Sequence, residues 1–230
     1  MHEVSTRFPP PYRLRCDTAL FPVPISADDA KRLSLDIAAT LFGQSLLWII
    51  AAHYQEAWYG PEERPYPKAA TRNDLYRELS YAVMTSVLPK SIVFGKLWVD
   101  APDDNPISLG QAYGFPKEPA SVAISTDDPR RLQWEAGDAA GPLLEIEAQE
   151  VSGLPRAPLT YLARATVFFT GTPFNAQMGV ERLSAAKILR VNRCHLPYFA
   201  SLGVHARPTF GLWFKDAHLL LGEPRRLSQR

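Results

Sequence analysis

The residue best placed for chemistry is Lys117, which ends the glycine- and proline-containing segment 110–117 (GQAYGFPK) and directly precedes a predicted strand. Pro116 restricts the backbone at this point, and Phe115 places an aromatic ring nearby. Burial disfavours the charged form of a lysine and lowers its pKa, which frees the amine for Schiff-base chemistry. A solvated lysine in a surface turn is the alternative that spacing alone leaves open.

Glu78 belongs to a stretch in which two sets of residues alternate, as they do on the opposite faces of a strand. One set is Leu79, Tyr81, Val83, Thr85 and Val87, and the other is Glu78, Ser80, Ala82, Met84 and Ser86. The first set predicts core packing. The second has mostly small side chains, which leave room for a ligand beside the carboxylate of Glu78. A solvated carboxylate at a strand end is the alternative.

Motifs for metals, nucleotides and serine nucleophiles do not occur in the sequence. The five histidines show no HxxxH, HExxH or HxH spacing, and Cys16 and Cys194 lie far apart. There is no GxGxxG, GxxxxGK[ST] or GxSxG motif. We therefore expect no metal site and no organic cofactor, and the two cysteines allow at most one disulfide bond.

Composition and charge describe an ordinary globular protein. The 230 residues are 46% hydrophobic and 21% charged, and the formal net charge is +1, so no global field favours nucleic acid. The longest apolar run, 46–52, has seven residues, whereas a membrane-spanning helix needs about 20. The first residues lack the basic and apolar segments of a signal peptide. We expect a single cytoplasmic domain over 1–230, without a nucleic-acid or membrane partner.

The 21 prolines favour many short elements joined by turns, because proline interrupts helices and sheet ladders. A helix is predicted that starts at Ser26, its N-cap, and ends just before Gly43, and shorter helical turns are predicted at 107–113 and 196–202. The segment 60–73 is predicted to be a long surface loop or lid. The predicted strands are 46–54, 79–87, 92–99, 121–125, 131–135, 143–151, 160–170, 185–191 and 209–214. This mainly β pattern indicates an antiparallel barrel or sandwich, and a barrel of this size can hold one small ligand.

Three motifs stand in a fixed order between residues 76 and 120: Tyr76-Arg77-Glu78, the strand end 97–100 (LWVD), and Phe115-Pro116-Lys117. Their order, and the separation between Glu78 and Lys117, resemble the acetoacetate decarboxylase family, and the segment 8–12 is similar to the family's opening more weakly. The resemblance implies a mainly β (β-rich α+β) fold, a closed cone-like antiparallel β-barrel with a few short helices. It also implies a symmetric homo-oligomer.

The same resemblance implies a reaction. Lys117 matches the lysine that forms a Schiff base with a small oxo acid, and Glu78 matches the active-site glutamate. Decarboxylation, or related aldol and dehydration chemistry, follows from such an imine without a cofactor. Lysine activation in acetoacetate decarboxylase is an established example of this chemistry. The alternative function is a non-catalytic β-barrel that binds a small apolar or acidic ligand.

Three positions depart from the family's pattern. Glu118 stands where the decarboxylase has a second lysine, and an adjacent anion would raise the pKa of Lys117 unless the two side chains point apart. The glycine-arginine-glutamate connector reads Gly110-Gln111-Ala112, or Leu109-Gly110-Gln111 with a slip of one residue, and either way its arginine is missing. The arginine that binds the substrate carboxylate aligns with Asp17. The resemblance therefore supports the family's fold for this chain more strongly than it supports the family's reaction.

Four further residues are candidates for substrate binding. Arg164 shares a predicted strand face with Thr166 and Thr170 and is suited to a carboxylate, with a rim salt bridge as the alternative. Arg15 lies close to the position of the family's arginine. Tyr113 and His53 are expected to line the cavity, with ordinary packing as the alternative for each.

Overall fold

The structure is a computed structural model that describes residues 8–33, 44–70, 72–86, 91–101, 110, 114–151, 167–171, 174–184, 186–222 and 225–226. The described residues include two short helices, α1 (Ala27–Arg32) and α4 (Pro197–Ser201). Its strands are β1 (Tyr12–Ser26), β2 (Gln44–Tyr59), β3 (Arg64–Pro65), β4 (Tyr76–Ser86), β5 (Ser91–Asp100), β6 (Lys117–Pro119), β7 (Ser121–Asp128), β8 (Arg131–Asp138), β9 (Gly141–Val151), β10 (Val167–Gly171), β11 (Phe174–Arg182), β12 (Lys187–His195), β13 (Phe210–Leu221) and β14 (Arg225–Arg226). The predicted mainly β fold is confirmed.

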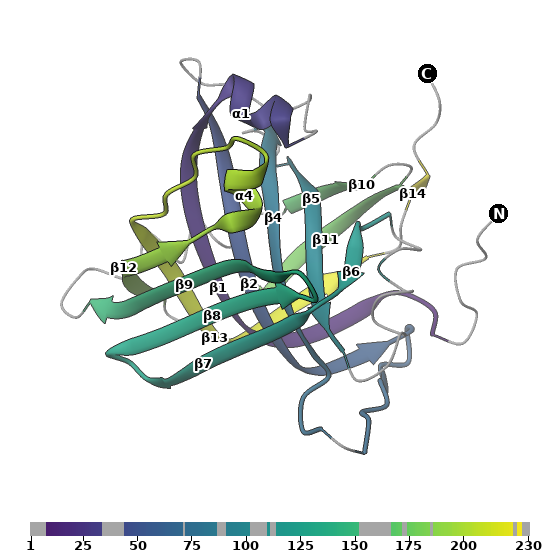
Figure 1. Ribbon diagram of the computed structural model, residues 1–230. Helices are drawn as coiled ribbons and strands as arrows, with labels where there is room; N and C mark the ends of the chain where they lie inside the picture. The colour runs from purple at the N-terminus through teal and green to yellow at the C-terminus, as the bar shows by residue number, and fades with distance from the viewer. Residues whose placement is uncertain are drawn as a thin grey trace.

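The long strands close into a ring (Figure 1). Strands β13, β1, β2, β4, β5, β10 and β11 pair in this order, and β11 pairs with β13 to complete the circuit. The pairs are antiparallel except for β10 with β5, and the short β6 also runs parallel to β5. The predicted cone-like barrel is thus present, and its parallel pairing is confined to the edge of β5 opposite β4.

A second layer covers one side of this ring (Figure 1). Strands β12, β9, β8 and β7 continue the sheet beyond β13 and pack their apolar faces against the outer face of β1, β2 and β4. The rings of Phe21 in β1 and Trp134 in β8 meet edge to face at 5.1 Å. This main core lies outside the barrel and supports the strands that carry the site.

A second apolar cluster fills the interior of the barrel. It contains Cys16, Tyr54, Tyr76, Leu97 and Val99 among its buried residues. Strand β4 divides its side chains as its sequence predicts, because Leu79, Tyr81 and Val83 belong to the outer core. Its alternate residues face the interior, and Glu78 and Ser80 are the buried polar side chains among them.

Strand β1 is the main element that we did not predict from the sequence. Its residues Pro22 and Pro24 argue against a central strand, yet β1 lies between β2 and β13. The register explains this, since β13 pairs with β1 only over residues 12–20. Both prolines lie beyond that pairing, in a part of β1 that pairs with β2 but not with β13, and proline is tolerated in a strand with one unpaired edge. The strand β11 is a second element that the sequence pattern did not indicate.

The helix predictions have mixed outcomes. The Ser26 side chain accepts a hydrogen bond from the backbone N–H of Asp29 at 3.0 Å, which confirms the predicted N-cap. The helix α1 ends at Arg32, and residues 34–43 lie outside the described residues. The predicted turn at 196–202 is α4, and the predicted helix at 107–113 is described only at Gly110. Among the described residues, no helix has the length and apolar character needed to span a membrane. Cys16 and Cys194 are free thiols.

Candidate active site

The turn before β6 aims Lys117 into the barrel. The N–H of Phe115 donates to the carbonyl of Gly110 at 3.0 Å, and the N–H of Leu97 donates to the carbonyl of Pro116 at 3.0 Å. Strand β6 then pairs with β5 so that Lys117 lies beside Leu97. Paired neighbours in a sheet point to the same face. Because Leu97 belongs to the interior cluster, the register places Lys117 inside.

Glu78 meets Lys117 in the interior. On the other edge of β5, Glu78 pairs with Val99, which is also an interior residue. Glu78 Oε2 lies 3.0 Å from Lys117 Nζ. Lys117 is only 7% exposed and Glu78 only 4%. The structure therefore brings together the two predicted catalytic residues as a buried ion pair, and it excludes the solvated alternatives for both.

Tyr76 is a third member of this cluster. It lies two residues before Glu78 on β4, so the two side chains share a face. Its hydroxyl accepts a hydrogen bond from Lys117 Nζ at 3.3 Å, and the same amine lies 4.6 Å from the centre of its ring. The ring stacks on Tyr54 at 4.3 Å. Burial raises the pKa of Tyr76 to about 12 against the opposing charge of Lys117, so its hydroxyl keeps its proton at neutral pH.

The charges and hydrogen bonds around Lys117 favour its protonated, ammonium form. Burial by itself lowers the pKa of Lys117, but the charge of Glu78, together with the contacts to Glu78 and Tyr76, outweighs burial and raises the pKa above its usual range. This direction is opposite to the activation expected from burial alone. The amine becomes nucleophilic only when it passes its proton on, and Glu78 is the carboxylate within reach.

Glu118 does not belong to the site. It pairs with Trp98 of β5, a residue of the outer core, and it therefore faces away from Lys117. Its carboxylate is 54% exposed and lies 3.0 Å from Lys96 Nζ. Although Glu118 departs from the family's pattern, its carboxylate makes no direct contact with the buried amine of Lys117.

Gly110 gives the Lys117 side chain the space it needs. A Cβ atom at Gly110 would lie 2.3 Å from Cδ and 2.5 Å from Cε of Lys117. Carbon atoms in contact stand about 3.5–4.0 Å apart. The glycine is therefore required by close approach, a role that its place in a loop motif did not indicate.

A pocket of about 80 Å³ opens beside Lys117. Its wall is aromatic and aliphatic. The described residues that line it are Tyr12, Leu14, Ala57, Tyr66, Leu75, Tyr76, Gly110, Phe115, Lys117 and Leu221. Among these, Lys117 is the one charged residue. The arrangement suits a small carbonyl compound whose reacting carbon meets the amine while an apolar part contacts the wall.

The arginines near the amino end of β1 face away from this pocket. Leu14 lines it, so its neighbours on the strand point to the other face. Arg13 forms ion pairs with Glu63 and Glu181. Arg15 Nε lies 2.6 Å from Asp216 Oδ1, and its guanidinium also pairs with Glu56. The predicted substrate contact of Arg15 is therefore replaced by ion pairs outside the pocket.

Asp17, which aligns with the family's carboxylate-binding arginine, supports the backbone instead. Its carboxylate accepts a hydrogen bond from the N–H of Asp216 at 2.8 Å. Asp216 has a positive φ of 54°, and the pairing of β1 with β13 shifts register beside it. Asp17 thus stabilises a bulge in β13.

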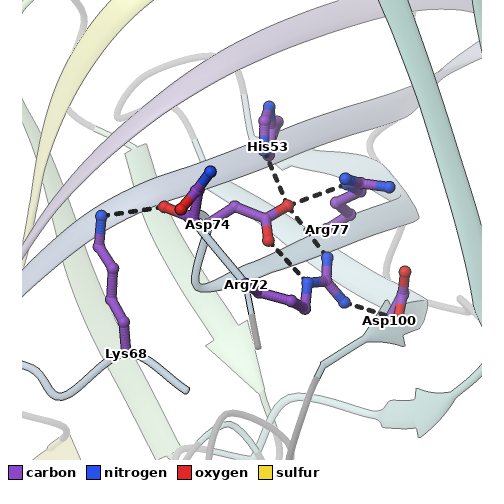
Figure 2. Close-up of polar contacts among 7 residues, drawn as sticks. His53, Lys68, Arg72, Asp74, Arg77 and Asp100 are labelled. Atoms are coloured by element: carbon purple, nitrogen blue, oxygen red, sulfur yellow. Dashed lines mark hydrogen bonds and ion pairs between the residues drawn. The ribbon is translucent and has the colours of Figure 1, made fainter. Parts of the chain in front are cut away.

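His53 belongs to a polar cluster that anchors the segment before β4 (Figure 2). Its Nε2 lies 2.9 Å from Asp74 Oδ2. Arg72 binds both oxygens of Asp74, at 2.7 and 3.0 Å, and also reaches Asp100 at 3.0 Å. Arg77 donates to Asp74 at 3.0 Å. His53 is therefore used in this cluster, and it is not among the described residues that line the pocket.

The Asp74 cluster lies close in sequence to two residues that line the pocket. Leu75 follows Asp74 directly, and Tyr66 belongs to the predicted loop 60–73, and both line the pocket. The N–H of Leu75 also donates to the carbonyl of Tyr54 at 2.9 Å. Part of the predicted lid is therefore a wall of the pocket, attached to the barrel by the Asp74 cluster.

Two predicted substrate contacts, Arg164 and Tyr113, lie outside the described residues and stay predictions. Tyr76 is a residue of the site that we did not predict from the sequence, although its spacing of two residues from Glu78 places both side chains on one face of an extended strand. Nothing local indicated the pocket residues Leu14 and Leu221, because β1 and β13 meet there only in the folded barrel.

Comparison with known proteins identifies the architecture. No family model matches the chain, and no curated protein matches its sequence. Among solved structures, acetoacetate decarboxylase from Legionella pneumophila has a TM-score of 0.66 at 12% identity, over 96% of this chain and 88% of that one. The chain has the acetoacetate decarboxylase fold.

Two further structures share this acetoacetate decarboxylase fold. An acetoacetate decarboxylase-like enzyme from Sphingomonas wittichii RW1 matches with a TM-score of 0.66 at 12% identity, over 96% of this chain and 94% of that chain. The enduracididine biosynthesis enzyme MppR matches with a TM-score of 0.63 at 14% identity, over 99% and 90% of the two chains. The resemblance predicted from residues 76–120 is confirmed at the level of the fold.

Proposed function

We propose that the protein is a cofactor-independent lyase that forms a Schiff base between Lys117 and a small oxo acid. The observation that carries the proposal is the buried contact of 3.0 Å between Lys117 Nζ and Glu78 Oε2, beside a small apolar pocket. The acetoacetate decarboxylase fold supports it. MppR, which has the same fold, has been solved in complex with pyruvate, a compound of the proposed substrate class.

The proposed reaction starts with proton transfer from the Lys117 ammonium to Glu78. The free amine adds to the carbonyl carbon, and the hydroxyl of the resulting carbinolamine leaves as water with a proton returned by Glu78. The iminium accepts the electron pair of the breaking C–C bond when carbon dioxide departs, or of a C–H bond in aldol and dehydration chemistry. In the decarboxylation the enamine is protonated at carbon, whereas in the aldol chemistry it attacks the carbonyl carbon of a second compound. Attack by water on the resulting iminium then releases the product and regenerates the amine.

Tyr76 supports the same chemistry. Its hydroxyl stays protonated and lies within hydrogen-bonding distance of the reacting nitrogen. It therefore holds the amine beside Glu78 in the resting state. The predicted contacts of the substrate with Arg164 and Tyr113 remain part of this proposal, as does assembly of the chain into a homo-oligomer. A particle of about 26 kDa in light scattering would contradict the oligomer.

The experiment that tests the lyase is adduct trapping. The protein is incubated with a panel of oxo acids, reduced with borohydride, digested and examined by mass spectrometry. We expect a reduced adduct on Lys117 and on no other lysine. An absence of adducts from the whole panel would overturn the proposal.

A non-catalytic barrel that binds a small ligand is the second candidate. The raised pKa of Lys117 favours it, because an ammonium ion held by Glu78 binds an anion or a carbonyl oxygen without reacting. Calorimetric binding of an oxo acid without any trapped adduct would support this candidate over the lyase.

A further inference from the structure

A larger groove lies in the outer layer of the protein, beside β12. It has a volume of about 630 Å³, within the range of about 300–1,000 Å³ that is typical of sites for small organic ligands. Residues 191–194 of β12 line one side and residues 204–209 line the other, with Leu196 and Ala200 between them. None of these residues lines the pocket beside Lys117. The groove is therefore a separate candidate site.

The groove forms where β12 separates from the chain that leads into β13. Strand β13 pairs with β12 only over residues 187–190, and the N–H of Val191 then donates to the carbonyl of Thr209 at 3.1 Å. Between Val191 and Arg193 the pairing of β12 with β9 shifts register, and irregularities of this kind redirect side chains. The chain returns from α4 to β13 past this part of β12 (Figure 1), so the groove lies between the two segments.

The apolar floor of the groove is held by the outer core. Leu196 and Val204 are buried members of that core. The N–H of Val204 donates to the carbonyl of Phe199 at 2.9 Å, and the guanidinium of Arg32 donates to the carbonyl of Gly203 at 2.5 Å. Core packing and these hydrogen bonds fix the segment that enters the groove, so the groove is largely pre-formed.

The groove carries positive charge without a counter-ion. Arg193 lines it from β12 and Arg207 lines it from the opposite segment, and none of the described lining residues is acidic. Neither arginine forms an ion pair with a carboxylate of the described residues. Glu147, the partner of Arg193 in the β9–β12 ladder, pairs with Arg131 instead, at 3.3 Å. Two guanidinium groups without a protein partner thus line one cavity.

The thiol of Cys194 locates Arg207 within the groove. Cys194 is partly buried, and burial raises the pKa of its thiol, whereas the charge of Arg207 lowers it. Charges near a protein surface act over a short distance because solvent and salt screen them. The guanidinium of Arg207 therefore lies near the side of the groove that β12 forms, where Arg193 also lies.

From the volume, the apolar floor and the two guanidinium groups, we propose that this groove binds an organic molecule with a dianionic head group, either a phosphate monoester or a dicarboxylate. Guanidinium groups bind the oxygens of phosphates and carboxylates through paired hydrogen bonds, so Arg193 and Arg207 hold the head group. The apolar part of the ligand contacts Leu196 and Val204, which favours its burial. The site is independent of the reaction proposed for Lys117.

Calorimetry with two matched pairs of probes tests the charge. Phenyl phosphate and phenyl sulfate have the same shape and number of non-hydrogen atoms, but at neutral pH the phosphate carries nearly two negative charges and the sulfate one. Phthalate and benzoate form the corresponding pair of carboxylates. In at least one pair the dianion should bind about fivefold more tightly, and that pair identifies the head group. Equal affinities within both pairs would overturn the inference.

Probes without a ring test the apolar contact. Inorganic phosphate lacks the ring of phenyl phosphate, and maleate lacks the ring of phthalate. The ring-free ion of the preferred class should bind more weakly than its aromatic counterpart, because it leaves the floor of the groove uncovered. Equal binding would contradict an organic ligand.

Substitutions place the binding in the groove. Arg193→Gln and Arg207→Gln should each weaken binding of the preferred dianion by about tenfold, the effect of losing hydrogen bonds from a charged group. Both arginines are exposed, so the variants should fold. Arg190→Gln is the matched control, because Arg190 is also exposed on β12 but does not line the groove. Wild-type affinity in both groove variants would overturn the inference.

Cys194 provides a second measurement in the unmodified protein. Iodoacetamide labels accessible thiols, and mass spectrometry reports the rate at each cysteine. A saturating dianion should slow the labelling of Cys194, whereas the fully buried Cys16 should stay unlabelled with and without the ligand. Unchanged labelling of Cys194 would show that the dianion binds elsewhere. Adduct trapping on Lys117 should be the same in all three arginine variants, so failure of this inference leaves the lyase proposal intact.

Discussion

Glu78 Oε2 lies 3.0 Å from Lys117 Nζ, and the two residues come from strands on opposite edges of β5. Both side chains are buried, so each charge depends on the other for its stability. A buried pair of this kind resists the loss of one partner much more than the loss of both. Two of the predictions below follow from this coupling.

Removing the cation alone should destabilise the fold. Lys117→Met leaves the Glu78 carboxylate buried without its partner, and the expected loss is about 3–5 kcal/mol of unfolding free energy at neutral pH. Urea unfolding of the variant measures it. The double variant Lys117→Met with Glu78→Gln removes both charges and should recover most of the loss. A single variant as stable as the wild type would show that the pair is not buried in solution.

Removing the anion alone should shift the pH profile of adduct trapping. In the wild type the pKa of Lys117 is raised, so the ion pair stabilises the fold fully below the usual lysine pKa of about 10.4, and its contribution is lost only as the pH rises through the higher folded value. In Glu78→Gln burial acts unopposed by that charge and lowers the pKa of Lys117. The midpoint of trapping against pH should therefore move to lower pH.

The same substitution should slow later steps. Glu78 is the proposed proton carrier, and a positioned acid or base contributes about 10²–10⁴-fold to a rate. Turnover of any substrate should fall by a factor in this range although the adduct still forms. A trapping midpoint that stays in place or moves to higher pH would contradict the assigned electrostatics.

Changing Glu118 should have little effect on Lys117. Glu118→Lys installs the residue that stands next to the reactive lysine in the acetoacetate decarboxylase family. Because Glu118 is largely exposed and pairs with Lys96 on the outer face, solvent screens its charge from the interior. The midpoint of adduct trapping should coincide with that of the wild type, with Glu78→Gln as the positive comparison. A clear shift would place Glu118 near the amine.

Gly110→Ala should displace the Lys117 side chain and lower the yield of its adduct. The added Cβ would lie 2.3 Å from Lys117 Cδ, so the lysine side chain must move from its position beside Glu78. We expect a loss of adduct yield of about tenfold or more, since misplacing a reacting group by about 1 Å can cost 10²-fold. Gly137→Ala is the control, because Gly137 lies in β8 and does not line the pocket, and the atom nearest to its added Cβ is the Gly141 carbonyl oxygen at 3.2 Å. Equal adduct yields for Gly110→Ala and the wild type would contradict the close packing.

The Asp74 cluster should control stability in acid. Burial alone raises the pKa of Asp74, but hydrogen bonds and charges from Arg72, with Arg77 and His53, hold it well below the usual carboxyl range. A depressed pKa contributes stability above the unfolded value of about 3.9 that is lost as the pH falls through the folded value. The urea midpoint should therefore drop between about pH 5 and pH 2 in the wild type, and less so in Asp74→Asn.

Asp28→Asn provides the matched control for this acid transition. Asp28 is 82% exposed in the first turn of α1, and its substitution should leave the acid dependence of the wild type unchanged. If Asp74→Asn and Asp28→Asn give the same profile, the cluster does not contribute to acid stability.

The sequence by itself determined local features of this protein, such as the face of a strand that a residue occupies and the residue at which a helix begins. Alternation along β4 placed Glu78 on the face opposite Leu79 and Tyr81, since side chains in a strand alternate by geometry alone. Ser26 indicated a helix start because its side chain satisfies a backbone N–H that the helix leaves free. The order of Tyr76, Glu78 and Lys117 indicated the fold through its resemblance to a family.

The tertiary structure decided everything that depends on register between distant strands. Pairing of β6 with β5 turned Lys117 inward and Glu118 outward, and the close contact with Glu78 raised the pKa of Lys117, whereas burial alone would have lowered it. Pairing of β1 with β2 and β13 turned Leu14 toward the pocket and Arg15 toward Asp216. A shift of one residue in either register would exchange these faces, and no local pattern specifies that choice, because it is set by the packing of the whole barrel.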